Sequence, residues 1–200
     1  MTRVTELLDK GAYEGLYDLL KELKRSADDA KEKAGERGTA VHHAAEQYAM
    51  FGAVPNPQEY PHELRGYIRA LAQWILEEQP VILASEQRVG SISRKFAGTY
   101  DLRFKQGDRL LLGDYKTSKR PYGEHFAQLG LYNLAAQECG EEPADALAVI
   151  NIREDGEYDQ FTLEADSELV HDAVLEAALT WYRGITALSK WVDDQIKRRR

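Results

Sequence analysis

Two aspartates and a lysine stand on consecutive strand-like segments of the sequence. Asp101 lies in FAGTYDLRF, and Asp114 and Lys116 lie in RLLLGDYK. Side chains alternate along a strand, so Asp114 and Lys116 share one face of a sheet while Tyr115 points to the other. Carboxylate oxygens suit Mg²⁺ or Mn²⁺, and an adjacent ammonium can orient an attacking water. The three residues predict metal-dependent hydrolysis; exposed acids and a solvated lysine at a strand end are the alternative.

The connection between the two segments decides whether the aspartates meet. If Gly107 and Asp108 form a two-residue turn, the register sets Asp101 directly across from Asp114. If Gln106 and Gly107 form the turn instead, Asp114 becomes a diagonal neighbour on the same face, and a three-residue loop would break this parity. Facing carboxylates repel each other by roughly 0.2–1 kcal/mol. A cation bound between them would turn that repulsion into attraction.

Two helical segments carry further polar pairs. In GTAVHHAAEQY, His42 and Glu46 are four residues apart and share one helix face, whereas His43 points elsewhere. An imidazole among carboxylates favours Mn²⁺ and other transition ions over Ca²⁺. In GEHFAQLGLYNLA, Gln128 and Tyr132 share a face in the same way. An amide and a phenol can bind phosphates or bases, although each pair is also typical of an ordinary helix surface.

Short basic segments flank the acidic pair in an otherwise acidic chain. SRK (93–95) precedes the second strand-like segment, and KTSKR (116–120) follows the third, ending in Lys119 and Arg120. These segments could hold phosphates beside a metal ion, or they could simply be solvated. The net charge of −8 argues against a protein that coats nucleic acid by charge alone.

Composition narrows the class of protein further. A chain of 200 residues, 43% hydrophobic and 30% charged, suits a soluble globular domain. The single cysteine, Cys139, excludes an intramolecular disulfide and an all-cysteine iron–sulfur site within one chain. No apolar run is long enough to cross a bilayer, and the N-terminus lacks the apolar stretch of a secretory signal. We therefore expect a cytoplasmic location and no membrane partner.

Hydrophobic periodicity predicts a mixed α/β domain built on one sheet. The helices are expected in residues 4–24, as one or two short helices, and in 39–50, 56–79, 123–138 and 164–200. Residues 24–38 are expected to be an exposed connection or a solvated helix. The strands are expected at 81–89, 96–104, 109–116, 146–153 and 158–163. We expect one domain over 1–200, comprising a helical extension (1–37), a catalytic core (38–163) and a C-terminal helix (164–200).

Taken together, these segments resemble the PD-(D/E)XK nuclease superfamily, and in particular its RecB-like exonuclease branch with phage and CRISPR-associated relatives. Four motifs stand in the order of that branch: GTAVH (38–42), GTYD (98–101), GDYKTSK (113–119) and QLGLY (128–132). The resemblance implies a restriction-endonuclease-like core, with a mixed central β-sheet flanked by helices and with helical N- and C-terminal extensions. Many relatives carry four cysteines around an iron–sulfur cluster, and this chain departs from them with its one cysteine.

The resemblance also implies a role for each residue singled out above. The expected catalytic residues are Asp101, Asp114 and Lys116. The expected ligands of Mg²⁺ or Mn²⁺ are His42, Asp101, Asp114 and the backbone carbonyl of Tyr115. Glu86 is a further candidate, for a second metal or a water, and an exposed strand residue is its alternative. The expected DNA contacts are Gln128, Tyr132, Lys119 and Arg120, with Glu46 as a secondary site residue.

The implied function is that of a metal-dependent DNA exonuclease in recombination, repair or DNA processing, in a bacterial cell or a phage-infected host. The expected partners are single- or double-stranded DNA ends and a separate helicase or recombination protein. A DNA endonuclease or an RNA-acting nuclease of the same fold is one alternative. A non-catalytic DNA-binding scaffold is another, against which the crowded acids at 101 and 114 argue.

Overall fold

The computed structural model describes residues 10–167, 170, 179, 180 and 190. The helix expected at 164–200 lies almost entirely outside the described residues. The chain divides into two compact units, Met1–Ala40 and Val41–Arg200. Among the residues described, no helix has both the length and the apolar character needed to span a bilayer.

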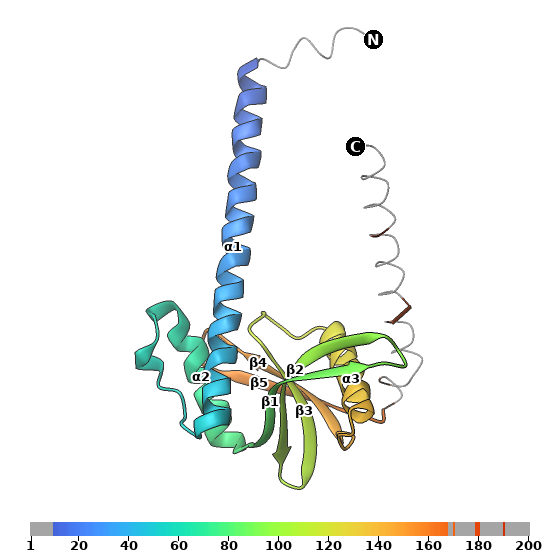
Figure 1. The fold of residues 1–200 in the computed structure, drawn as a ribbon. Coiled ribbons are helices and arrows are strands. Elements are labelled where there is room, and N and C mark those ends of the chain that lie inside the picture. The colour runs from blue at the N-terminus through green and yellow to red at the C-terminus, as the bar shows by residue number, and fades with distance from the viewer. Residues whose placement is uncertain (1–9, 168–169, 171–178, 181–189, 191–200) are drawn as a thin grey trace. The chain divides into compact units, whose positions relative to one another are not determined.

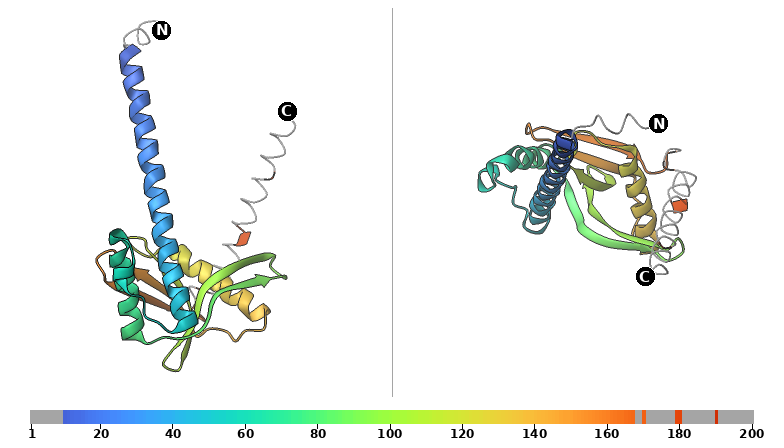
Figure 2. Two further views of the ribbon diagram at one scale, coloured as in Figure 1. Left: turned by 60° about the vertical axis from the view of Figure 1, so that its left-hand side comes forward. Right: turned by 90° about the horizontal axis from the view of Figure 1, so that it is seen from above.

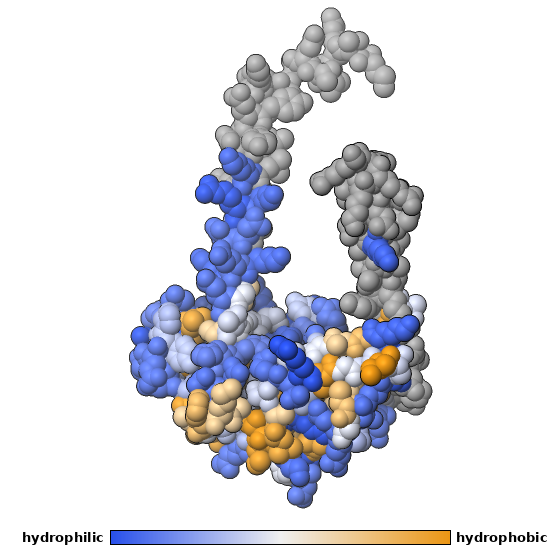
Figure 3. All heavy atoms as spheres, viewed as in Figure 1, coloured by the Kyte–Doolittle hydropathy of each residue, from blue (hydrophilic) through white to orange (hydrophobic). Residues whose placement is uncertain are grey.

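Helix α1 (Lys10–Phe51) supplies the described part of the first unit and continues into the second at Val41. The sequence predicted shorter helices here, with a connection or a solvated helix between them. The solvated helix is the alternative observed, because residues 24–38 are rich in strong helix formers and contain no proline. Oppositely charged residues four apart, such as Asp29 and Lys33, support it. The surface of this segment is hydrophilic (Figure 3).

A five-stranded mixed sheet forms the centre of the second unit (Figure 1). Its order is β1-β2-β3-β4-β5, in which β3 and β4 are parallel and the other neighbours are antiparallel. The strands are β1 (Val81–Ser91), β2 (Phe96–Gln106), β3 (Arg109–Lys116), β4 (Ala146–Ile152) and β5 (Tyr158–Glu164). Helix α3 (Gly123–Glu138) connects the two parallel strands. The predicted mixed α/β core is confirmed.

Helices cover both faces of this sheet (Figure 2). Helix α2 (Arg65–Glu78) follows two 3₁₀ turns, Pro57–Glu59 and His62–Leu64. Together with the end of α1, it packs in one apolar cluster against one face of the sheet. Helix α3 packs in a second cluster with the other face. Among the described residues, Trp74 is the largest fully buried side chain, and it meets the rings of Phe104 and Tyr115 edge-on. These contacts fix α2 on the sheet beside the aspartates.

The β2–β3 hairpin has the two-residue turn that the sequence allowed. Gln106 pairs with Arg109, and Gly107 has a φ of 62°, as a primed turn requires. The ladder between β2 and β3 ends at the pair Leu102 and Gly113. Strand β2 nevertheless continues along β1 as far as Phe96. Strands β2 and β3 therefore cease to pair at the positions of Asp101 and Asp114.

Strand β1 is an edge strand of the sheet and is irregular in two places. The pairing of β1 with β2 shifts register between Ile82 and Ala84. Farther along, Glu86 has a φ of 50°, in the left-handed region that a glutamate rarely adopts. Glu86 stands between Ser85 and Gln87, which pair with positions on either side of Asp101. The irregular edge strand thus brings an acid to the place where β2 and β3 part.

Helix α2 approaches the turn between β4 and β5 so closely that only glycine fits at its second residue. A Cβ built on Gly66 would overlap the backbone carbonyl of Glu154. We therefore expect Gly66→Ala to lower the free energy of unfolding by about 2 kcal/mol, the scale of overpacking in a well-packed interior. Urea denaturation measures this loss.

Gly123→Ala is the matched control, because nothing lies within 4 Å of its added Cβ and Gly123 is also at the start of a helix. Its stability should be unchanged or slightly raised, since alanine favours helix more than glycine does. Equal effects of the two substitutions would contradict the close approach at Gly66.

Candidate functional site

Three side chains from three different elements meet beside the parting of β2 and β3. Nδ1 of His42 on α1 lies 3.2 Å from Oε1 of Glu86 on β1, and Nε2 lies 3.7 Å from Oδ2 of Asp101 on β2. Each residue offers one potential ligand atom, and these atoms all lie within 4.8 Å of one another. This cluster, His42–Glu86–Asp101, contains the donor types that divalent transition ions accept.

Local structure holds each member of the cluster in place. His42 stands next to the buried Val41 on α1, and its ring meets that of Tyr115 edge-on, with centroids 6.0 Å apart. Glu86 is held by the left-handed backbone described above, a conformation that costs about 1–3 kcal/mol and persists where its surroundings fix it. Such strain is typical of functional sites.

The carboxylate of Asp101 takes the place of the missing ladder between β2 and β3. The backbone N–H of Tyr115 donates to Oδ2 of Asp101 over 2.7 Å, within the buried part of the site. Asp101 is therefore tied to β3 through its side chain at the point where the backbones stop pairing. The same oxygen is the one nearest to His42, so one atom links α1, β2 and β3.

Asp114 and Lys116 form the second part of the site. Nζ of Lys116 lies 2.5 Å from Oδ2 of Asp114, and the Asp114 side chain is only 6% exposed. Among the described residues, Oδ2 of Asp114 has no hydrogen-bond partner, so the ion pair is its one compensation. A buried carboxylate oxygen without a hydrogen bond is costly. Buried carboxylate oxygens that hold only one charged partner can accept a further cation, so the donors here fit a divalent metal ion.

Burial and charge crowding change the protonation of Asp101. Desolvation, and after it the negative charge of Asp114, raise the pKa of Asp101 to about 7 in the metal-free protein. His42, the Tyr115 N–H and Lys116 act in the opposite direction and only partly offset the rise. The repulsion expected between the two aspartates is thus present, and a bound cation would relieve it.

Comparison with known protein families identifies the family of the chain that carries this site. The family model of the PD-(D/E)XK nuclease superfamily matches residues 57–194. The chain belongs to that superfamily. Membership implies a metal-dependent nuclease, and hence a hydrolase that acts on nucleic acid. A search of curated proteins found no match.

The matched range covers most of the residues that the sequence singled out in this nuclease. Glu86, Asp101, Asp114 and Lys116 lie inside it, whereas His42 precedes it. The structure nevertheless brings His42 to the acids. The metal-ligand roles, including that of the Tyr115 carbonyl, stay predictions.

Glu46 does not join the cluster. Its carboxylate lies 3.9 Å from Nδ1 of His43, an exposed neighbour three residues earlier on α1. Helical spacing predicts that His42 and Glu46 share a face, but no contact between Glu46 and the cluster supports its role as a secondary site residue. The nearest carboxylates to His42 come instead from the sheet.

Gln128 and Tyr132 of α3 form one unit. Nε2 of Gln128 donates to the Tyr132 hydroxyl over 2.9 Å, and the half-buried ring of Tyr132 lies against the backbone of Gly98. A Cβ on Gly98 would overlap that ring. The ring of Tyr132 thus packs on Gly98, three residues before Asp101. This contact holds α3 against β2, the strand that carries Asp101.

The basic side chains of the two segments differ in how accessible they are to a nucleic acid. In SRK (93–95), the Arg94 guanidinium pairs with Glu138 over 3.1 Å, and this contact ties the β1–β2 hairpin to the end of α3. Lys119 and Arg120 are exposed, and the Arg120 guanidinium stacks 5.3 Å above the Tyr122 ring. Lys119 and Arg120 are therefore the more accessible cations near Lys116.

His125 is a titratable side chain near the Asp114–Lys116 pair that sequence reasoning did not single out. It stands in the first turn of α3, where its Nδ1 accepts the backbone N–H of Tyr122. Burial and the positive charge of Lys116 lower the pKa of His125, and the charge of Asp114 acts in the opposite direction. The imidazole therefore lies within electrostatic range of both. Only its position shortly before the Gln-x-x-x-Tyr motif could have drawn attention to it.

The raised pKa of Asp101 makes stability depend on pH. The ordinary pKa is 3.8 and the folded value about 7, so between these limits the folded state holds a proton that the unfolded chain has lost. Stability therefore falls as pH rises through that window. Asp101→Asn retains an oxygen for the Tyr115 N–H and carries no charge. We expect the metal-free variant to melt a few degrees above wild type at pH 8 and close to it at pH 5.

Thermal melts in EDTA at the two pH values check this difference, and melts in Mn²⁺ supply the control. Mn²⁺ should raise the melting temperature of wild type more than that of Asp101→Asn, because a ligand that binds only the folded state stabilises it. The same gap between variant and wild type at both pH values would contradict a raised pKa at Asp101.

Proposed function

We propose that this nuclease is a DNA exonuclease that hydrolyses phosphodiester bonds at strand ends with Mg²⁺ or Mn²⁺. The observation that carries the proposal is the His42–Glu86–Asp101 cluster beside the Asp114–Lys116 ion pair, in a chain of the PD-(D/E)XK superfamily. Five polar groups from α1, β1, β2 and β3 converge there.

The metal ligands in this proposal are His42, Asp101, Asp114 and the backbone carbonyl of Tyr115, with Glu86 serving a second metal or a water. A divalent cation supplies, when bound, activation of the attacking water and neutralisation of charge on the phosphate. The nitrogen of His42 favours Mn²⁺ among the hard cations. The buried carboxylate of Asp114, whose Oδ2 has only the Lys116 ammonium as a partner among the described residues, supports its place in the set.

Lys116 holds and orients the attacking water and stabilises the negative charge that develops on the phosphate. Its ammonium is kept in place by Asp114, and a quarter of its side chain stays exposed, so the group is both fixed and accessible. Preorganised positive charge at a developing negative charge is commonly worth about 100-fold or more in rate.

Gln128, Tyr132, Lys119 and Arg120 position the DNA strand. Gln128 is exposed and donates to the Tyr132 hydroxyl, so it presents a fixed amide to the solvent in the second turn of α3. Lys119 and Arg120 follow Lys116 directly and offer charge for backbone phosphates. Such contacts set the register of the strand on the protein.

Exonuclease action and a role in recombination, repair or processing are inferred from the RecB-like order of the four motifs. The same reasoning suggests that a separate helicase or recombination protein supplies unwound ends. DNA rather than RNA is the proposed substrate. No base-reading element is evident in the sequence, in keeping with recognition of ends rather than of a sequence.

One substrate panel tests the proposal. End-labelled linear single- and double-stranded DNA, covalently closed circles and a matched RNA are each incubated with Mg²⁺, with Mn²⁺ and with excess EDTA. We expect progressive loss of linear DNA, survival of circles, and Mn²⁺ at least as effective as Mg²⁺. Full activity of the pure protein in EDTA would overturn the metal-dependent mechanism.

The other outcomes of the panel point to particular alternatives. Rapid nicking of closed circles identifies an endonuclease, and faster loss of the RNA identifies an RNA-acting enzyme. Metal-dependent binding of DNA with no hydrolysis under any condition identifies a non-catalytic scaffold.

Lys116→Ala should reduce turnover by about 100-fold or more at saturating DNA, because it removes the positive charge held at the site. Lys105→Ala is the matched control: it removes the same charge from an exposed position near the opposite end of the β2–β3 hairpin. Single-turnover cleavage in Mn²⁺ measures both variants, with thermal melts to verify folding. Wild-type turnover in a folded Lys116→Ala protein would remove Lys116 from the site.

A further inference from the structure

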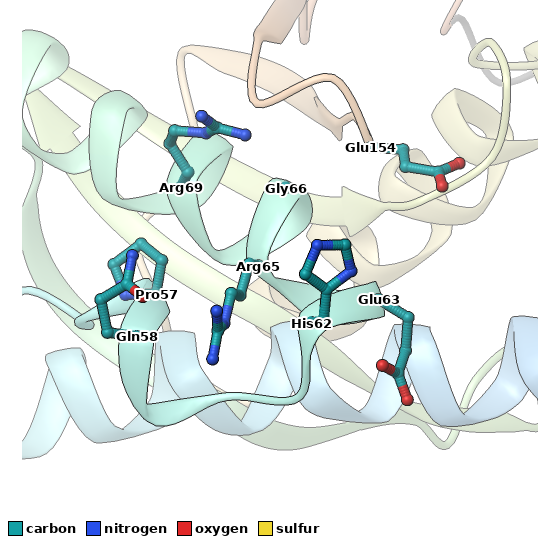
Figure 4. Close-up of a pocket in the computed structure, with 8 residues that line it drawn as sticks. All are labelled: Pro57, Gln58, His62, Glu63, Arg65, Gly66, Arg69 and Glu154. Carbon is teal, nitrogen blue, oxygen red and sulfur yellow. The ribbon is translucent and has the colours of Figure 1, made fainter.

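A second polar pocket, of about 390 Å³, lies at the start of α2 (Figure 4). Its walls come from the two 3₁₀ turns before α2, the first two turns of α2 and the turn after β4. Three basic side chains line it: His62, Arg65 and Arg69. None of its residues belongs to the His42–Glu86–Asp101 cluster.

The two arginines are fixed yet retain free donors. Arg65 and Arg69 are four residues apart and share one face of α2. Nε of Arg65 donates to the backbone carbonyl of Tyr60 over 3.0 Å, which leaves its terminal nitrogens without a partner among the described residues. Arg69 has no ion-pair partner among the described residues. Its guanidinium lies against Gly156, where an added Cβ would overlap it. Fixed guanidinium groups with unused donors suit an oxyanion.

Two carboxylates also line the pocket, and they lie on its other side. In Figure 4, the carboxylate of Glu154 points away from Arg65 and Arg69, and the side chain of Glu63 extends on the far side of His62 from Arg65. Oε2 of Glu154 accepts a weak hydrogen bond from the hydroxyl of Tyr67 over 3.4 Å. Among the described residues, neither carboxylate forms an ion pair with Arg65 or Arg69, so both guanidinium groups can accept an anion.

The pocket lies at the end of the sheet where β3 and β4 end, the end that carries the Asp114–Lys116 pair. Strands β3 and β4 are parallel, and Lys116 at the end of β3 pairs with Asn151 near the end of β4. Glu154 follows three residues later. With strands about 4.8 Å apart and a rise of about 3.3 Å per residue, the Cα atoms of Lys116 and Glu154 are at most about 15 Å apart. That distance is a few nucleotides of an extended strand.

We propose that this pocket binds a backbone phosphate of the nucleic-acid strand, a few nucleotides from the scissile bond. Arg65 and Arg69 donate to the phosphate oxygens, and His62 adds a donor from the preceding turn. The proposal rests on the nuclease function proposed above. The pocket anchors the strand, and the chemistry stays at the Asp114–Lys116 pair.

Equilibrium binding tests the proposal without turnover. A fluorescent single-stranded oligonucleotide is titrated with the protein in Ca²⁺, a hard cation that occupies oxygen ligands, over a series of KCl concentrations. The double variant Arg65→Gln, Arg69→Gln should bind about tenfold more weakly at low salt. The slope of log K against the logarithm of the KCl concentration should become shallower by about 0.7 for each phosphate that the variant no longer neutralises.

Two controls share the chemistry of the change. Arg109→Gln removes an exposed guanidinium that pairs with Glu164 at the opposite end of β3, and should leave both affinity and slope unchanged. Glu63→Gln removes a negative charge from the pocket itself and should leave binding equal or tighter. Thermal melts verify that each protein is folded, and the single variant Arg69→Gln replaces the double variant if that one is unstable.

The outcomes separate this proposal from the nuclease function. An unchanged affinity and slope in the folded arginine variants, with wild-type protein that binds and cleaves, overturns the pocket alone. An equal weakening in Arg109→Gln also overturns it, since the effect is then one of overall charge. Wild-type protein that neither binds nor cleaves nucleic acid overturns the nuclease function first.

Discussion

The hydrogen bond from the Tyr115 backbone to the Asp101 carboxylate holds the site together. Strands β2 and β3 pair regularly from their hairpin to Leu102 and Gly113 and then separate. A side chain replaces the backbone ladder at that point. The separation gives room for acids and a histidine to gather, and the hydrogen bond limits how far the strands move apart. The rest of the site follows from this single substitution of a carboxylate for a peptide group.

An acidic protein that binds a polyanion must concentrate its positive charge. The net charge is −8, yet the end of the sheet that carries Asp114 also carries Lys116, Lys119 and Arg120, with Arg65 and Arg69 on α2 nearby. Electrostatics of this kind favours a specific docking geometry more than it favours affinity.

The five strands and helix α3 were predictable because their signals are local, whereas the helix expected from residue 56 begins only at Arg65, after two 3₁₀ turns. The hairpin turn at Gly107 and the limits of α3 follow from glycine placement and apolar spacing. The continuous helix α1 was less evident, since a charged segment without large apolar residues is equally typical of a loop. Helical spacing alone paired His42 with Glu46, whereas the tertiary fold brings His42 to Glu86. The left-handed backbone at Glu86 has no sequence signal, because only glycine or asparagine at that position would have indicated it.

The irregular edge strand has a consequence for solubility. A flat, regular edge presents unpaired N–H and C=O groups to any other strand and invites intermolecular pairing. In β1, exposed Val81 and Leu83 would make such an edge adhesive. The register shift beside Leu83 and the kink at Glu86 interrupt that edge, and a carboxylate stands at the kink. The same distortion that delivers an acid to the site thus leaves a second molecule no continuous template on which to add a strand.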